Sequence, residues 1–120
     1  MKIAISSQGK DMESAIDPRF GRTRYFIVVD TETDLFTIHD NEQNLNALQG
    51  AGIQAAKNVT DFGVQAVISG NIGPNAFATL NAVEIDVYTG ASGTVQDAVT
   101  AFKERTLKKT EKSNVQGHWM

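Results

Sequence analysis

The sequence of 120 residues contains no cysteine, no excess of basic residues and no long hydrophobic run. The absence of cysteine excludes disulfide bonds, and it excludes thiolate ligation of zinc or of a conventional iron–sulfur cluster. The net charge of −3 argues against a general nucleic-acid-binding protein, which needs clustered cationic surface. No segment approaches the ~20 apolar residues of a membrane span. We therefore expect neither a nucleic acid nor a membrane as partner.

The composition is that of one ordinary globular domain, with 41% hydrophobic and 21% charged residues. A chain of this length buries about two-thirds of its unfolded surface, so it needs no stabilising cross-links. Its first six residues are typical of a β-strand rather than of a cleavable leader. These features predict a cytoplasmic monomer with a single domain over residues 1–107 and a polar, flexible tail over 108–120.

The pattern of apolar residues predicts an α/β chain. Apolar segments at 25–30 and 35–40, separated by a polar turn, indicate a β-hairpin. Later strands alternate with helices, which is typical of parallel strands joined by crossover helices. The predicted strands cover 2–6, 25–30, 35–40, 64–69 and 85–88, and the predicted helices cover 51–62, 74–83 and 94–102. We therefore expect a mixed five-stranded sheet with helices packed on it.

Three glycine-containing turns, at 49–52, 70–74 and 90–94, each precede a predicted helix. Ligands of open α/β sheets bind beyond the carboxyl ends of the strands, and free N–H groups at helix starts attract anions. The turns therefore suit a small anionic ligand. Glycine is also the usual residue of any tight turn, so these glycines could equally serve only to shape the chain. None of the turns matches a Walker A loop or a dinucleotide-binding fingerprint.

The polar loop before the second strand carries Arg19, Arg22 and Arg24 within six residues. Arginine presents a planar set of donors that suits oxyanions and similar multi-acceptor groups. The alternative is a solvated basic loop in which Arg19 pairs with Asp17. Phe20, in the middle of this loop, is expected to anchor it in the core.

Residues 17–22 (Asp-Pro-Arg-Phe-Gly-Arg), the following strand at 25–30 and the glycine turns resemble the dinitrogenase iron–molybdenum cofactor biosynthesis family, the NifX-like and NifB C-terminal-like group. The resemblance covers about residues 1–107. It implies a ribonuclease H-like fold of three layers, which agrees with the strand order above. It also implies a protein that binds or carries metal–sulfur clusters or their precursors and is not an enzyme. The Asp-Pro-Arg-Phe-Gly-Arg form is most similar to members that carry a molybdenum–copper sulfide cluster.

The resemblance and the residue types together predict a carrier that holds its cluster without covalent bonds. Some relatives have histidine where this chain has Arg19 or Gln49, and neither of these side chains offers the imidazole nitrogen that ligates metals. We therefore expect a molybdenum–copper sulfide cluster held by charge, hydrogen bonds and shape, delivered by a donor protein or passed to a recipient. The predicted cluster-binding residues are Arg19, Phe20, Gly21, Arg22, Arg24, Gln49, Gly50, Gly52, Gly70, Asn71, Ile72, Gly73, Gly90, Ser92, Gly93 and Thr94.

No set of catalytic residues emerges from the sequence. A two-metal nuclease needs clustered carboxylates, and the first predicted strand carries none. His39 is expected on the outward face of the hairpin, and His118 lies in the predicted tail. An interaction or regulatory domain with a vestigial pocket remains the alternative function. An enzyme acting on a small phosphorylated substrate has less support, because no acid/base pair is visible.

Overall fold

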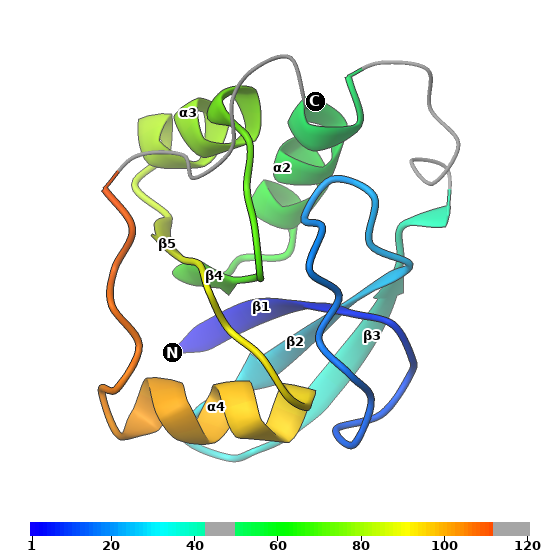
Figure 1. The fold of residues 1–120 in the computed structure, drawn as a ribbon, viewed down its shortest axis with the longest axis vertical. Helices are drawn as coiled ribbons and strands as arrows, with labels where there is room; N and C mark the ends of the chain where they lie inside the picture. The colour runs from blue at the N-terminus through cyan, green and yellow to red at the C-terminus, as the bar shows by residue number, and fades with distance from the viewer. Residues whose placement is uncertain (43–49, 112–120) are drawn as a thin grey trace.

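The computed structural model describes residues 1–42 and 50–111, and the central element is a five-stranded mixed sheet in the order β3-β2-β1-β4-β5 (Figure 1). β1 pairs antiparallel with β2 and parallel with β4, while β2–β3 forms the hairpin and β4–β5 is parallel. The strands are β1 (Lys2–Ser7), β2 (Tyr25–Asp30), β3 (Phe36–Asp40), β4 (Ala66–Ile68) and β5 (Asp86–Tyr88), and the helices are α2 (Ala51–Asp61), α3 (Pro74–Ala82) and α4 (Val95–Lys103).

Helices cover both faces of the sheet, which gives the three-layer α/β architecture expected from the sequence (Figure 1). α2 and α3 pack on one face, where Phe26 and Val28 of β2 meet Val59 and Leu80 of the helices. α4 packs on the other face. Successive side chains of each strand point alternately into the two cores. Because helices cover both faces of the sheet, nearly all residues of β1 and β2 are buried.

Local sequence signals explain where most helices begin. Pro74 takes the first turn of α3, where its missing N–H costs nothing. Thr94 and Asp97 form the predicted capping box of α4, with Thr94 Oγ1 accepting from the Asp97 N–H at 3.0 Å. One expectation at a helix end was wrong. In the predicted helix over 74–83, Val83 has the spacing of a buried residue, but it follows the last residue of α3 and is 49% exposed.

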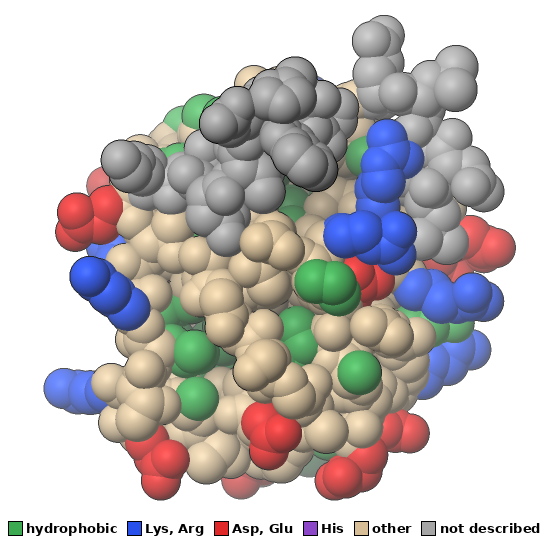
Figure 2. Space-filling model, in the orientation of Figure 1, with side chains coloured by type: hydrophobic (Ala, Val, Ile, Leu, Met, Phe, Trp, Pro, Cys, Tyr) green, Lys and Arg blue, Asp and Glu red, His purple; other side chains and the backbone are tan. Residues whose placement is uncertain are grey.

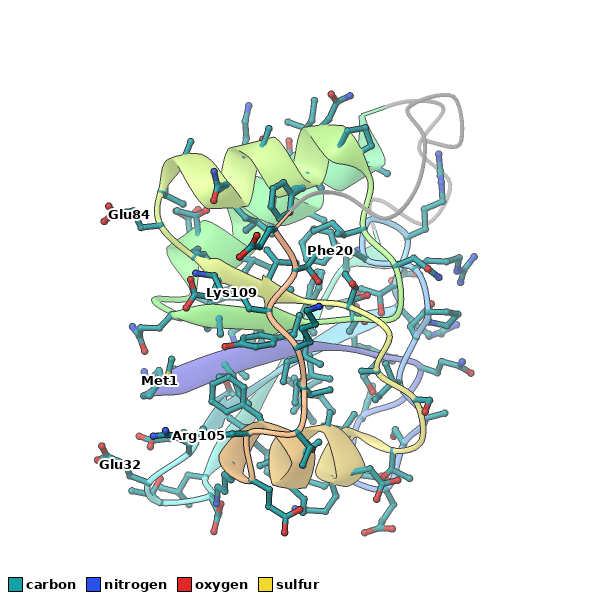
Figure 3. The ribbon with its side chains drawn as sticks, turned by 60° about the vertical axis from the view of Figure 1, so that its left-hand side comes forward. Met1, Phe20, Glu32, Glu84, Arg105 and Lys109 are labelled. Carbon is teal, nitrogen blue, oxygen red and sulfur yellow. The ribbon has the colours of Figure 1, made fainter. Side chains whose placement is uncertain are left out.

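The outer edge of β5 is paired with the chain that follows α4. Lys109 forms a β-bridge with Tyr88, and the Thr110 N–H donates to the Val87 carbonyl at 2.7 Å. Lys109 Nζ also pairs with the Asp86 carboxylate at 3.0 Å, and Figure 3 shows Lys109 lying against β5. Lys109 and Thr110, which fall in the predicted tail over 108–120, thus pair with the backbone groups of an edge strand.

His39 lies on the α2 side of β3, contrary to the expected outward position. Its ring is half-buried and stacks on Phe62, with the ring centroids 4.0 Å apart. Thr37 Oγ1 lies 3.0 Å from His39 Nε2. The prediction was wrong because the ring of Phe62, just after α2, covers the His39 side chain, which the hairpin alone would leave exposed.

We expect the fold to lose stability as the pH falls, in part through His39. Burial lowers the pKa of His39 below its ordinary value of 6.5. The unfolded chain regains the ordinary pKa and binds more protons, so stability falls as the pH drops below about 6.5. Replacing His39→Gln should flatten the pH dependence in this window, as measured by urea unfolding at a series of pH values. An unaltered pH dependence would show that the imidazole has no such role.

Candidate functional site

A long loop over residues 8–24 lies across the carboxyl ends of β1, β4 and β5. Its backbone is hydrogen-bonded to the turns that follow β4 and β5. The Ile16 N–H donates to the Gly93 carbonyl at 2.9 Å, and the Asn71 N–H donates to the Pro18 carbonyl at 2.8 Å. The Phe20 N–H donates back to the Asn71 carbonyl at 3.2 Å. The arginine loop and the glycine turns therefore lie together at one end of the sheet, as the sequence predicts.

Two glycines allow the loop to approach the rest of the chain closely. A Cβ at Gly21 would lie 2.8 Å from the Cα of Gly52 in α2, and a Cβ at Gly70 would lie 2.7 Å from the Cα of Pro18. Both contacts are with backbone, which has no rotamer through which to move away. Gly21 and Gly70 therefore fix the distance between the arginine loop and the turns beneath it.

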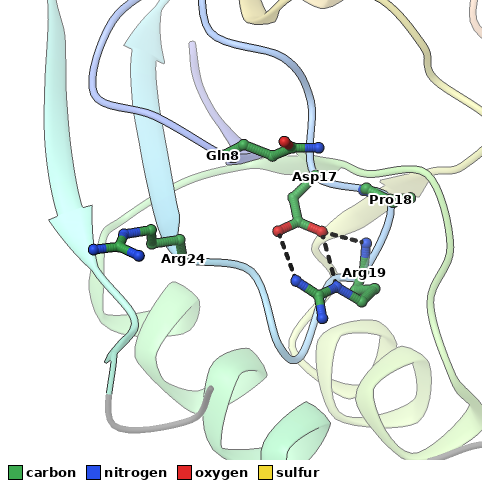
Figure 4. A pocket seen from close by; sticks show the side chains of 5 residues that line it. All are labelled: Gln8, Asp17, Pro18, Arg19 and Arg24. Carbon is green, nitrogen blue, oxygen red and sulfur yellow. Dashed lines mark hydrogen bonds and ion pairs between the residues drawn. The ribbon is translucent and has the colours of Figure 1, made fainter. Parts of the chain in front are cut away.

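A pocket of about 430 Å³ opens beside this loop and is lined by Gln8, Asp17, Pro18, Arg19 and Arg24 (Figure 4). Of these residues, the sequence predicts only Arg19 and Arg24 as ligand-binding, and it indicates Asp17 as an ion-pair partner of Arg19. No sequence pattern predicts Gln8 or Pro18 as a lining residue. These two line the pocket because the loop folds back over the end of β1.

The carboxylate of Asp17 organises the arginine motif from a buried position. Its side chain accepts from the backbone N–H of Arg19 at 2.9 Å and from Arg19 Nε at 3.2 Å. The second oxygen accepts from Arg19 Nη2 at 3.4 Å (Figure 4). Asp17 is 2% exposed, while the side chain of Arg19 is 61% exposed. The predicted alternative, an Arg19–Asp17 pair, is thus present, and it leaves three of the five guanidinium N–H groups for other acceptors.

Arg24 stands across the pocket from this pair, and its guanidinium points away from Arg19 (Figure 4). Its Nε donates to the hydroxyl of Tyr25 at 3.3 Å, which raises the pKa of Arg24 above its ordinary value. Lys10 Nζ lies 5.6 Å from the centroid of the Tyr25 ring, as does the Arg24 guanidinium carbon. Figure 2 shows Lys and Arg side chains gathered on this side of the molecule. The pocket rim is therefore basic, although the whole chain is acidic.

The start of α4 does not offer the free N–H groups that the sequence analysis expected there. The Thr94 and Asp97 N–H groups are used in the capping box. The Val95 N–H donates to Ser14 and the Gln96 N–H to Met12, both carbonyls of the long loop. This part of the prediction was wrong, because the loop itself occupies the helix start. Gly90, Ser92, Gly93 and Thr94 belong to the turn that holds the loop.

The other predicted residues lie in different surroundings. The side chains of Phe20 and Ile72 are buried in the core, as expected for Phe20, and contact of these two residues with a ligand stays a prediction. Gly50, Gly52, Gly73 and Asn71 lie at or before the starts of α2 and α3, where no side chain caps the helix. Arg22 is half-buried in the arginine loop, and Gln49 lies outside the described residues.

Direct metal ligation has no support in the described part of the chain. Residues 1–42 and 50–111 contain no group of three His, Cys, Asp or Glu side chains that could hold a metal ion. In the same ranges, no helix is long and apolar enough to cross a membrane. The pocket is lined by two guanidinium groups, the Gln8 amide and the Asp17 carboxylate, and because Asp17 is paired with Arg19 the remaining donors suit an anion.

The sheet order, the three layers and the basic pocket at the carboxyl ends define a ribonuclease H-like α/β domain with a site suited to an anion. The chain belongs to the dinitrogenase iron–molybdenum cofactor family, whose model matches residues 1–105.

Solved structures and a curated relative agree with this assignment. The apo form of the orange protein from Desulfovibrio gigas has a TM-score of 0.93 and 33% identity, covering 95% of this chain and 96% of that one. A Thermotoga protein assigned to NifB has a TM-score of 0.80 and 36% identity, covering 95% and 98%. The uncharacterized protein MJ0580 of Methanocaldococcus jannaschii is 30% identical over 113 residues, which is 92% of both chains.

Proposed function

We propose that this protein is a non-catalytic carrier of an anionic metal–sulfide cluster, held in the pocket beside the 8–24 loop. The observation that carries the proposal is the basic pocket rim in an acidic chain, within a domain that matches the family model over residues 1–105. The likeness to the orange protein supports a molybdenum–copper sulfide as the cargo. A donor or recipient protein in cluster assembly is the matching partner.

The cargo would be held by charge and hydrogen bonds. Arg24 is fully exposed to solvent at the rim, and Arg19 has guanidinium N–H groups that Asp17 does not use. Sulfide ligands carry diffuse negative charge and accept several weak hydrogen bonds, so a guanidinium plane suits them better than a compact ammonium group. Because Asp17 offsets part of the charge of Arg19, Arg24 contributes the larger share of the uncompensated positive charge.

Reconstitution with tetrathiomolybdate and a copper(I) salt tests the proposal. After desalting, we expect absorbance from the bound sulfide and a fixed ratio of molybdenum to copper by elemental analysis. Recovery of metal-free protein under these conditions would contradict the carrier function. It would favour the alternative of an interaction domain with a vestigial pocket.

Substitution of Arg24→Gln is expected to weaken binding of tetrathiomolybdate about three- to fivefold, because a solvent-exposed charge pair contributes only modestly to binding. Titration followed by absorbance measures the change, and the effect should shrink at high salt. Arg105→Gln is the matched control, because it removes the same charge at the opposite end of the sheet (Figure 3). Equal losses in the two variants would show that net charge, rather than the pocket, governs binding.

A further inference from the structure

The two edges of the sheet differ in how they are protected. The backbone of β5 is paired on its outer side by residues 109 and 110. β3 forms the other edge and has only β2 as a neighbour in the sheet among the residues that the structure describes. Unpaired edge strands are usually blunted by proline, lysine or a bulge, because they otherwise accept another strand. Residues 36–40 contain neither proline nor lysine, and their pairing with β2 runs in register throughout.

The hydrogen bonds that flank β3 show which backbone groups face outward. The Asp30 N–H donates to the Leu35 carbonyl at 2.9 Å, and the Asn41 N–H donates to the Arg24 carbonyl at 3.0 Å. Alternate residues of an antiparallel pair exchange hydrogen bonds, so the odd-numbered residues of β3 face β2. The N–H and carbonyl groups of Phe36, Ile38 and Asp40 therefore point to the open edge.

The same edge exposes apolar side chains. Phe36 and Ile38 are each 41% exposed, and Leu35, just before the strand, is 73% exposed. Phe36 and Ile38 lie opposite Val29 and Ile27, whose side chains belong to the core beneath α4. The apolar surface of this face therefore continues from the core to the edge of the sheet, beyond the residues that α4 covers.

Acidic residues flank this apolar strip at both ends. Glu32 and Asp34 precede β3, and Asp40 and Glu42 end it, and all four are exposed. Lys103 pairs with Asp34, and the N-terminal ammonium group lies 3.8 Å from Glu32 Oε1, so the net negative charge lies mainly at the Asp40 and Glu42 end of the strand. A strand that pairs here gains from apolar side chains at its centre and from Lys or Arg near Asp40 and Glu42.

This charge pattern argues against a second copy of the chain as the occupant. A two-fold axis that relates identical antiparallel strands passes beside one residue, and residue 38 gives the longest overlap of residues 36–40 with their own copy. That register places Asp40 of one copy opposite Phe36 of the other, and Glu42 opposite Asp34. Like charges placed directly opposite each other are destabilising.

We propose that the β3 edge is a docking site for a partner protein, which adds an extended segment of apolar residues flanked by Lys or Arg. The site adjoins the pocket, since Asn41 follows β3 and its Nδ2 donates to the carbonyls of Gly21 and Thr23, at 3.2 and 2.9 Å. A partner docked on β3 thus lies beside the arginine loop. The docking site stands independently of whether the pocket carries a cluster.

Titration of ¹⁵N-labelled protein with the peptide Lys-Thr-Val-Thr-Val-Thr-Lys, blocked at both ends, tests this inference. We expect the largest amide shifts in residues 36–40 and slower hydrogen exchange for the outward N–H groups. The matched control Glu-Thr-Val-Thr-Val-Thr-Glu has the same apolar content and should bind more weakly. Equal binding of the two peptides, or no shifts in β3 at millimolar peptide, would overturn the proposal. A dimer that pairs through β3 in the absence of peptide would also overturn it.

Two variants separate docking from folding. Ile38→Pro removes an N–H group that points to the open edge, so peptide binding should be lost. The fold should be retained, because the hydrogen bonds to β2 come from the odd-numbered residues. Ile38→Val keeps that N–H and should bind as the parent does. The double change Asp40→Asn with Glu42→Gln should weaken the lysine peptide about three- to fivefold. Unchanged affinity in the proline variant would contradict pairing at this edge.

Discussion

Replacing Phe20→Ala is expected to lower the free energy of unfolding by about 3–5 kcal/mol. Phe20 is 2% exposed and lies in the core between the sheet and helices α2 and α3 (Figure 3). Its ring packs against Phe26 with the centroids 5.2 Å apart. Alanine would leave a cavity beneath the arginine loop, and neighbouring backbone held in the sheet cannot close it. Urea unfolding followed by circular dichroism measures the loss.

Phe20→Leu provides the control for this substitution. Leucine keeps most of the apolar volume and should cost less than half as much as alanine. A loss below about 1 kcal/mol for Phe20→Ala would show that the loop is not anchored through this ring. The amide spectrum of a folded variant would then show whether residues 17–24 have moved.

Substitution of Gly21→Ala is expected to destabilise the fold by about 1–3 kcal/mol, because the added Cβ meets backbone atoms of Gly52 at 2.8 Å. The φ angle of Gly21 is not in the left-handed region, so alanine would otherwise stabilise the chain by about 0.4–1 kcal/mol. The sign of the effect therefore decides whether the close contact exists. Thermal and urea unfolding both measure it.

Gly63→Ala gives a comparison in which only backbone conformation matters. Gly63 has φ +74° and no atom within 4 Å of a Cβ, so its cost of about 1–2 kcal/mol arises from the left-handed conformation alone. We expect amide shifts around the arginine loop in Gly21→Ala and none there in Gly63→Ala. Stabilisation of the protein by Gly21→Ala would contradict the packing of the loop on α2.

The sequence predicts the elements well because each carries a local signal. The hairpin follows from two apolar segments around a polar turn, and α4 follows from the Thr94–Asp97 capping box. Ile53 shows the limit of such reasoning. It has the spacing of a core residue in α2, but the structure leaves it half-buried and buries Ala51 and Ala55 instead. α2 packs most extensively on α3, so tertiary packing rather than local spacing decides which of its residues are buried.

The site is less predictable, because its donors depend on long-range hydrogen bonds. The grouping of the arginine loop with the glycine turns follows from strand order. The use of the α4 N–H groups by carbonyls of Met12 and Ser14 does not, because those residues lie about 80 positions away along the chain. The burial of Asp17 likewise depends on where the loop crosses the sheet. Local patterns therefore identified the arginines and the Arg19–Asp17 pair, but not the burial of the Asp17 carboxylate.

The attachment of the loop also determines how the pocket responds to a ligand. The Asp17 carbonyl accepts from Ser6 Oγ at 2.7 Å, and the Ser6 hydroxyl is itself 2.9 Å from Ser69 Oγ at the end of β4. The backbone of the arginine motif is thereby ordered when the protein folds, so binding need not pay the entropy of ordering a loop. A preorganised pocket of this kind can load quickly. It can also release a bound ligand by exchange at its open rim.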